Sequence, residues 1–397
     1  METNDTLSNQ SYAQDVIQEI NDEIITVDVR RNYSSQKELI LQDFMDVEYI
    51  ALETNDDFLN QGRVMDIGKE IIAVKNQVDD GNIYIYDRHG KALRKINHKG
   101  QGPGEYTSIS TITLDEDNEE IFVNDTNMRK IYVYDFYGNF KRSFNHQEGF
   151  GSSNIGNIAI KEYSFYSEIF NYDKNKLICY DRINNRIAFI LISKHDGGII
   201  KEIIIPFKDK KSLEQSRLDG ENIYSIGPRP YHSIIPYNGN WILSEISSDT
   251  VYTFLTGYSL RPFIVRTPSI QSMNPEVMLI LRFLSERYIV METIRNEYNF
   301  DTQTGFLRTW LIYDKQNKTF FEYTIYNSDY SSKKEIFIAE FTPVNQEIAT
   351  WYPLQAYQLV EDYENGRLKD GRLKEIAAKL DVEDNPVIML IKHKNRG

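Results

Sequence analysis

Residues 81–106 read GNIYIYDRHGKALRKINHKGQGPGEY, and this stretch decides the fold. The run Ile83–Tyr86 is β-branched and aromatic, which is the composition of a β-strand. The tetrapeptide DRHG at 87–90 supplies a turn, because Asp can accept hydrogen bonds from nearby backbone and Gly tolerates a positive φ. Residues 91–96 read as the returning strand. The stretch therefore predicts a β-hairpin.

The same hairpin recurs further along the chain, where residues 131–140 read IYVYDFYGNF and a returning strand follows. Matching turns fall near residues 87, 135, 195, 256 and 314. At the last of them Asn317 stands in for the turn glycine, since Asn also tolerates the left-handed region. Hairpins repeated at a spacing near the usual range of about 40–50 residues are typical of β-propeller blades.

Strand-like segments between these turns divide most of the chain into blades. The first five blades are predicted at 63–96, 109–144, 158–206, 231–266 and 288–326. Between blades, residues 208–219 are predicted to form a charged loop or a short helix, and Pro275 is predicted to open a helix through Leu284.

The remaining residues predict a sixth blade with strands at 336–341, 354–360 and 387–391 and an amphipathic helix at 368–380. A closed ring is expected because an open one would leave exposed strand edges. We expect closure by an N-terminal strand that joins the last blade, either 23–30 or 47–52.

The sequence thus predicts an all-β protein with one domain. Residues 23–397 are expected to form a single six-bladed β-propeller of four-stranded antiparallel blades, closed by an N-terminal strand in the last blade. Residues 1–22 are polar and are expected to be a flexible leader.

Charge and composition exclude several classes of protein. The net charge of −14 argues against nucleic-acid binding, because no basic field exists to displace counterions. Cys179 is the single cysteine, so it cannot form an intrachain disulfide and is predicted to be a buried structural thiol. No apolar run approaches the roughly 18 residues that a membrane span needs. The chain does not open on a signal segment, which fits a cytoplasmic protein or an exported one whose signal lies outside this sequence.

Three elements resemble a known family. They are the hairpin I-Y-[IV]-Y-D-x-x-G, the sequence GQGPGEY at 100–106 and the sequence NPVIML at 385–390. They resemble the six-bladed β-propeller proteins of gut Bacteroides, which are distantly similar to NHL and TolB-type propellers. The resemblance implies a six-bladed ring in an exported cell-envelope lipoprotein of the outer membrane or periplasm, with a cytoplasmic location as the alternative. Its lipid anchor would lie outside this sequence. The resemblance implies no activity.

No catalytic set and no metal site is apparent. A G-x-S-x-G elbow is absent, and the six His form no pair at metal-ligand spacing. The acidic run 115–118 lacks the Gly and Glu of an EF-hand and is predicted to be a solvated turn. No cofactor is assigned, although a Ca²⁺ ion in the central channel stays open. Paired carboxylates also stay open, because a propeller site collects single residues from several blades.

Two loops carry the candidate binding groups. One is the link GQGPGEY between blades one and two, which is predicted to be a turn near the channel. The other is GPRPYH at 227–232, where a rigid turn displays Arg, Tyr and His together. The candidate ligand-binding residues are Gln101, Glu105, Tyr106, Arg229, Tyr231 and His232.

These features predict a binding or interaction scaffold. Aromatic residues make up 13% of the chain, and with Asn and Arg they suit glycans or peptides through ring stacking and hydrogen bonds. The alternative is a metal-assisted hydrolase or lyase with its site in the central channel. A purely structural partner in an envelope complex is a third reading.

Overall fold

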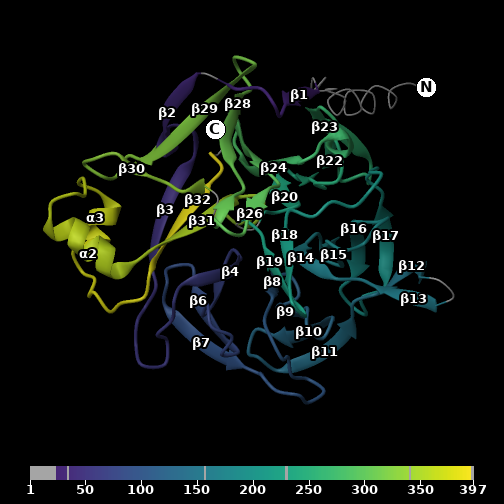
Figure 1. Ribbon diagram of the computed structural model, residues 1–397. Coiled ribbons are helices and arrows are strands. Elements are labelled where there is room, and N and C mark those ends of the chain that lie inside the picture. Colours follow the sequence, from purple (N-terminus) through teal and green to yellow (C-terminus); the bar gives the residue numbers. More distant parts are fainter. Residues whose placement is uncertain (1–23, 34, 156–157, 229–230, 339–340, 395–397) are drawn as a thin grey trace, which may run out of the picture.

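The computed structural model describes residues 24–33, 35–155, 158–228, 231–338 and 341–394, and its sheets surround a common centre (Figure 1). The first strands of neighbouring blades contact one another, as β8 (Thr111–Asp115) does with β4 (Arg63–Ile67) and with β14 (Tyr166–Asn171). The prediction of a six-bladed β-propeller is confirmed.

The first three blades each have four antiparallel strands in chain order. Blade one is β4, β5 (Ile71–Lys75), β6 (Asn82–Asp87) and β7 (Ala92–Asn97); blade two is β8, β9 (Glu120–Asp125), β10 (Lys130–Asp135) and β11 (Phe140–Asn145); blade three is β14, β15 (Lys176–Asp181), β16 (Phe189–Ser193) and β17 (Ile199–Ile203). A hairpin of β12 (Glu148–Ile155) and β13 (Ile158–Tyr163) links the last two. The IYIY run of β6 is buried throughout, because neighbouring blades cover both faces of the strand.

Blades four and five also have four antiparallel strands each. Blade four is β20 (Ile234–Tyr237), β21 (Asn240–Leu243), β22 (Thr250–Phe254) and β23 (Leu260–Thr267); blade five is β24 (Val277–Leu284), β25 (Tyr288–Arg295), β28 (Arg308–Asp314) and β29 (Thr319–Asn327). A short 3₁₀ turn, η1 (Ile270–Ser272), and a small hairpin of β26 (Tyr298–Asn299) and β27 (Thr304–Gly305) complete this region.

Of the two elements predicted between blades, one is wrong and the other is correct only in its first part. The helix predicted from Pro275 to Leu284 is the strand β24, whose continuous apolar run is buried because it is the first strand of its blade. Residues 208–214 form a loop, as predicted for 208–219, but residues 215–219 form a strand, β18 (Gln215–Asp219), in place of the loop or short helix. It pairs with β19 (Asn222–Ile226) across a turn at Gly220, whose φ of 62° suits glycine.

The sixth blade has three strands within the described residues: β31 (Ile348–Leu354), β32 (Val387–Lys392) and β3 (Asp46–Ala51). β3 pairs antiparallel with β32, so an N-terminal strand closes the ring as predicted. The 47–52 alternative is correct, and the 23–30 alternative is wrong.

The N-terminal segment does more than close the ring, because it first follows the outer edges of two other blades. β1 (Ile25–Asp28) pairs parallel with β23 of blade four, and β2 (Gln36–Ile40) pairs parallel with β29 of blade five. A short helix, α1 (Leu41–Phe44), then leads into β3. One continuous segment therefore ties together blades four, five and six. The predicted leader at 1–22 lies outside the described residues.

The strands predicted at 336–341 and 354–360 are wrong. Of the first region, the described residues 336–338 and 341 form no strand, and the two-residue β30 (Lys334–Glu335) lies just before them. Most of the second region belongs to the helix α2 (Ala356–Glu364). In α2 the buried residues Ala356, Leu359 and Asp362 recur at helical spacing. The short apolar run in this segment also fits a strand, and this explains the wrong prediction. The predicted helix at 368–380 is confirmed as α3 (Arg372–Ala377). Both helices are inserted between β31 and β32 and lie at the outside of blade six (Figure 1).

The repeated turns form as the sequence predicts, with one correction. Asp87 Oδ1 accepts hydrogen bonds from the backbone N–H groups of His89 and Lys91, and Gly90 has a φ of 85°. In the turn after β28, however, the positive φ of 52° belongs to Lys318 and not to Asn317. The side chain of Asn317 instead donates a hydrogen bond to Asp314.

Replacement of Gly90 by alanine should destabilise ring closure. A Cβ atom there would lie 2.0 Å from the carbonyl oxygen of Ala51 in β3, and the φ of 85° disfavours any other residue. We expect a loss of about 2 kcal/mol or more in the free energy of unfolding, measured by chemical denaturation. Gly257→Ala is the matched control, because a Cβ atom there meets nothing within 4 Å. Equal stability of the two variants would contradict the described contact.

Candidate functional site

A cavity of about 660 Å³ lies where the first strands of blades one to four end, and we call it the channel-mouth cavity. It collects residues from four blades and from the segment that precedes β31. Its lining residues include Asp66, Lys69, Glu70, Glu116, Asp117, Phe170, Asn171, Tyr172, Asp173, Trp241, Thr256, Tyr258, Asn345, Gln346 and Glu347. These residues are polar at the turns and aromatic along one wall.

The segment 344–347 fixes one side of the cavity. Asn345 donates its Nδ2–H to the carbonyl oxygen of Ile67 at 2.9 Å, at the end of β4. Gln346 donates to the carbonyl oxygen of Asn240 at 2.8 Å and accepts from the N–H of Gly239 at 2.8 Å. Since β4 belongs to blade one and Asn240 to blade four, this segment joins two blades that are not neighbours along the chain.

The aromatic wall comes from blades three and four. The rings of Trp241 and Tyr172 stack with centroids 5.7 Å apart, and Tyr172 stacks in turn on Tyr258 at 6.2 Å. Phe170 meets Trp241 edge-on at 6.0 Å. Trp241 is buried while Tyr258 is exposed, so the wall runs from the interior to the surface. Such a row is rigid, because each ring restricts the next.

The carboxylate of Glu116 organises the opposite side. It accepts backbone hydrogen bonds from Lys69 at 2.6 Å and from Glu70 at 2.7 Å, so it binds the turn between β4 and β5 from the neighbouring blade. Gly68 leaves room for this carboxylate, since a Cβ atom would lie 2.2 Å from Glu116 Oε1 and the glutamate side chain would have to shift. The turn after β8, predicted to be solvated, therefore forms part of the cavity.

Among the acidic residues that line the cavity, Asp66 has the most strongly shifted pKa. Its carboxylate accepts hydrogen bonds from the backbone N–H of Leu114 at 2.7 Å and of Ile67 at 2.8 Å. Burial nevertheless raises the pKa of Asp66 to about 7, and the negative charge of Glu116 adds to the rise. A carboxyl group with a strongly raised pKa at the wall of a cavity is typical of functional sites.

Asp66→Asn should change how stability depends on pH. Between the ordinary pKa of Asp, about 3.8, and about 7, the folded protein holds a proton at Asp66 that the unfolded chain has lost. The wild type therefore loses stability as the pH rises through this range, and the variant does not. From pH 5 to pH 8 we expect the variant to gain about 2–3 kcal/mol relative to the wild type in denaturation experiments. A pH-independent difference would contradict the raised pKa.

The candidate residues of the GQGPGEY link lie outside this cavity. Gln101 and Glu105 are exposed, and Glu105 accepts a hydrogen bond from the backbone N–H of Gly102. Tyr106 is fully buried and donates its hydroxyl to the carbonyl oxygen of Gly81 at 2.7 Å. These contacts stabilise the link between blades one and two. Their role in ligand binding stays a prediction.

The second candidate loop lies nearer the other ends of the same first strands. Arg229 lies outside the described residues. His232 Nδ1 is 3.8 Å from Glu168 Oε2, and Glu168 also accepts from the backbone N–H of Ser233 at 2.8 Å. Burial, together with the charge of Glu245, raises the pKa of Tyr231. The structure thus brings Tyr231 and His232 to buried glutamates but not to the channel-mouth cavity, and their binding role also stays a prediction.

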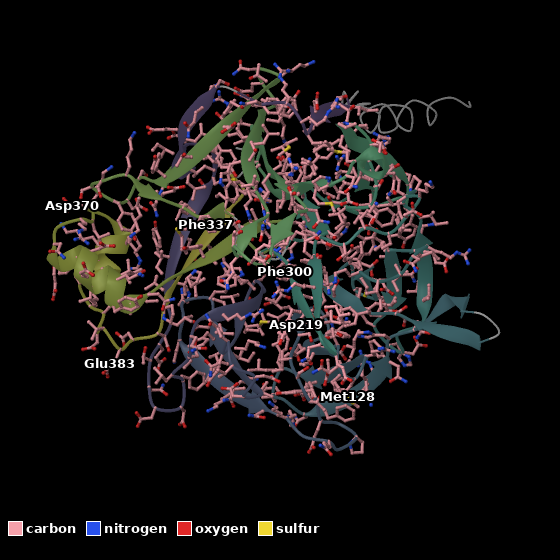
Figure 2. All side chains as sticks on the ribbon, viewed as in Figure 1. Met128, Asp219, Phe300, Phe337, Asp370 and Glu383 are labelled. Carbon is pink, nitrogen blue, oxygen red and sulfur yellow. The ribbon has the colours of Figure 1, made fainter. Side chains whose placement is uncertain are left out.

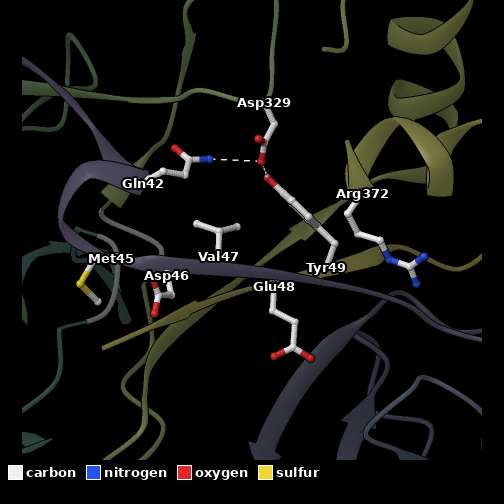
Figure 3. Close-up of a pocket in the computed structure, with 8 residues that line it drawn as sticks. All are labelled: Gln42, Met45, Asp46, Val47, Glu48, Tyr49, Asp329 and Arg372. Carbon is white, nitrogen blue, oxygen red and sulfur yellow. Dashed lines mark hydrogen bonds between the residues drawn. The ribbon is translucent and has the colours of Figure 1, made fainter. Parts of the chain in front are cut away.

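Smaller hollows lie beside the N-terminal strand. One of about 430 Å³ is lined by residues of β3 and by Gln42, Asp329 and Arg372 (Figure 3). In it, the hydroxyl of Tyr49 donates to Asp329 at 2.6 Å and Gln42 donates to the same carboxylate at 3.2 Å. Tyr49, Gln42 and Asp329 therefore already use much of their hydrogen-bonding capacity on one another. Across the described residues no group of three or more His, Cys, Asp or Glu side chains is arranged to hold a metal ion.

Sequence reasoning missed the cavity because its residues are scattered. They come from the ends of β4, β8, β14 and β20 and the turns that follow them, from β21, from the turn after β22 and from a segment that no repeat marks. The one usable signal was the acidic run at 115–118, which contains Glu116 and Asp117. Strand periodicity could not show that this turn faces Lys69 and Glu70 of another blade.

Comparison with known proteins places the chain in a family. A family described as a domain of unknown function, DUF4934, matches residues 24–392. The chain belongs to this family. No curated protein matches the DUF4934 chain.

Solved structures share the fold of this DUF4934 chain. A candidate exported protein of Bacteroides fragilis matches with a TM-score of 0.56 and 15% identity, over 94% of this chain and 100% of that one. A DUF4221 member from Bacteroides vulgatus matches with a TM-score of 0.48 and 13% identity, over 89% and 100%. Virginiamycin B lyase of Staphylococcus aureus follows with a TM-score of 0.38 and 12% identity, over 88% and 100%. At these identities the likeness concerns the fold alone.

Helices in the described part of the chain are all too short or too polar to cross a membrane. Cys179 is buried and free, as predicted.

Proposed function

We propose that the DUF4934 chain is a binding scaffold that takes a glycan or a peptide in the channel-mouth cavity. The observation that carries this proposal is the meeting of an aromatic wall with carboxylate and amide groups in one cavity of about 660 Å³. Ligand sites are usually concave, with volumes of about 300–1,000 Å³, and combine apolar walls with a few oriented polar groups.

The chemistry of the wall and rim suits both ligand classes. The apolar face of a sugar ring or an aliphatic side chain can pack against the edges of Tyr172 and Tyr258. Hydroxyl and N–H groups of the ligand can donate to carboxylate and amide oxygens such as those of Asp117 and Gln346. The blades and the 344–347 segment hold these groups in place before a ligand binds. Binding should therefore cost little conformational entropy of the protein.

Glycan and peptide arrays test the proposal, with a variant that narrows the cavity. Thr256 lines the cavity from an exposed turn, so Thr256→Trp should fill part of it without disturbing the core. We expect the wild type to enrich a defined set of ligands and the variant to lose that enrichment while its thermal unfolding is unchanged. Absence of enrichment by a folded wild type, or equal enrichment by the variant, would overturn the proposal.

We further propose that the protein works outside the cytoplasm, in the cell envelope, as a lipid-anchored propeller of NHL or TolB type. The family resemblance in the sequence supports this location, and so does the likeness to a candidate exported protein of Bacteroides fragilis. Fractionation of cells that express the full gene product should recover the protein with the envelope. Recovery in the cytosol would contradict the proposal.

A further inference from the structure

The charge of the channel-mouth cavity is strongly one-sided. Its lining residues include six carboxylates and a single cation, Lys69. Two carboxylates already have partners, since Asp173 pairs with Lys176 at 2.5 Å and Glu347 with Lys392 at 3.0 Å. Within the described residues, the other four form no ion pair. They are Asp66, Glu70, Glu116 and Asp117.

These four carboxylates come from the end of β4, from the turn after it and from the neighbouring turn after β8. Asp66 and Glu70 belong to blade one, and Glu116 and Asp117 belong to blade two. Like charges held this close repel, and the raised pKa of Asp66 reflects both burial and the charge of Glu116. A bound cation would relieve this repulsion, whereas a neutral ligand would leave it in place.

The aromatic wall is also suited to positive charge. The faces of tyrosine and tryptophan rings attract cations, most strongly where water is excluded. Lys176 already lies over the ring of Tyr172, 5.9 Å from its centroid, and Lys201 lies 5.6 Å from that of Tyr258.

We propose that the channel-mouth cavity selects ligands that carry a protonated primary amine. The inference rests on the proposed function and narrows it to one ligand chemistry. The amine can belong to an amino sugar or to a lysine side chain, and the experiment distinguishes these sources.

Calorimetric titration with matched charged and neutral probes is the test. Glucosamine is compared with N-acetylglucosamine, and Nα-acetyl-lysine amide with its Nε-acetylated form. We expect the charged member of at least one pair to bind about tenfold tighter or more, a difference of about 1.4 kcal/mol. The pair that shows this preference identifies the source of the amine.

Charge reversal at the rim provides the matched variant. Glu70→Lys combined with Asp117→Lys changes two exposed turn side chains, so the fold should be retained. This double variant is expected to lose the preference for the charged probe. Glu383→Gln is the control, because Glu383 lies at the periphery beside the helical insertion (Figure 2) and should bind as the wild type does.

The affinity for Nα-acetyl-lysine amide should also rise from pH 5 to pH 8, because Asp66 becomes ionised in that range while the probe keeps its charge. The other charged groups that line the cavity are Lys69, Glu70, Glu116, Asp117, Asp173 and Glu347. Beside them lie Lys176 and Lys392, which pair with Asp173 and Glu347, and Lys201, which lies over the ring of Tyr258. The carboxylates among them are paired with lysine, hydrogen-bonded to backbone or exposed at turns, so Asp66 is expected to dominate the pH dependence.

The outcomes separate this inference from the proposed function. Equal binding of charged and neutral probes, lost in Thr256→Trp, would overturn the selection for amines and leave the cavity as the binding site. Charged preference that survives in the double variant would also overturn it. Absence of binding by every probe and every array ligand would overturn both.

Discussion

Replacement of Glu292 by glutamine is expected to lower the free energy of unfolding by about 3–5 kcal/mol. Glu292 is fully buried in blade five, where its carboxylate accepts from Arg282 Nε at 2.9 Å and from Arg308 Nη1 at 3.0 Å. Arg282 is buried as well. The change removes the negative charge to which two guanidinium groups are bonded, and their desolvation is then no longer offset.

Thermal and urea unfolding measure this effect, with Glu297→Gln as the control. Glu297 also pairs with an arginine, Arg295, at 2.6 Å, but both side chains are about half exposed. Solvent screens such a pair, so its loss should cost about 1 kcal/mol or less. If both variants lost the same free energy of unfolding, the buried contacts of Glu292 with Arg282 and Arg308 would not stabilise the protein more than an exposed ion pair does.

Deletion of residues 1–33 is expected to have an effect of similar size. It removes β1 from the outer edge of blade four, together with the buried side chains of Val27, Val29 and Tyr33. Loss of this apolar burial should cost on the order of 5 kcal/mol. It also frees the edge of β23, which can then pair with another molecule.

Deletion of residues 1–22 is the matched control, because it removes only the predicted leader. We expect this shorter deletion to keep both the stability of the full chain and its molar mass in light scattering. The longer deletion should unfold at lower temperature and self-associate. If both deletions behave alike, the N-terminal segment does not bind the outer edges as described.

Local patterns made the blades readable from the sequence. The IYIYDRHG and IYVYDFYG hairpins carry strand composition and turn chemistry within ten residues. The local sequence is therefore enough to predict them. The sequence of β24 does not predict its structure for the opposite reason. A short apolar run after a proline fits a buried strand as well as a helix, and only the contacts of the run with other blades decide between them.

The candidate site could be predicted far less well. Asp66 lies in β4 of blade one and Glu116 in the turn after β8 of blade two, and nothing in either local sequence shows that they share a cavity. The GQGPGEY link drew attention because of its composition, yet the main role of Tyr106 is to fill the space between blades one and two. Sites that collect single residues from several blades leave no local motif.

A crystal structure of the complex with the best array ligand would locate the binding site directly. We expect the ligand to lie in the channel-mouth cavity, against the wall of Tyr172 and Tyr258, with a charged amine near Asp66. A ligand bound instead beside Tyr231 and His232, nearer the other ends of the first strands, would contradict this expectation.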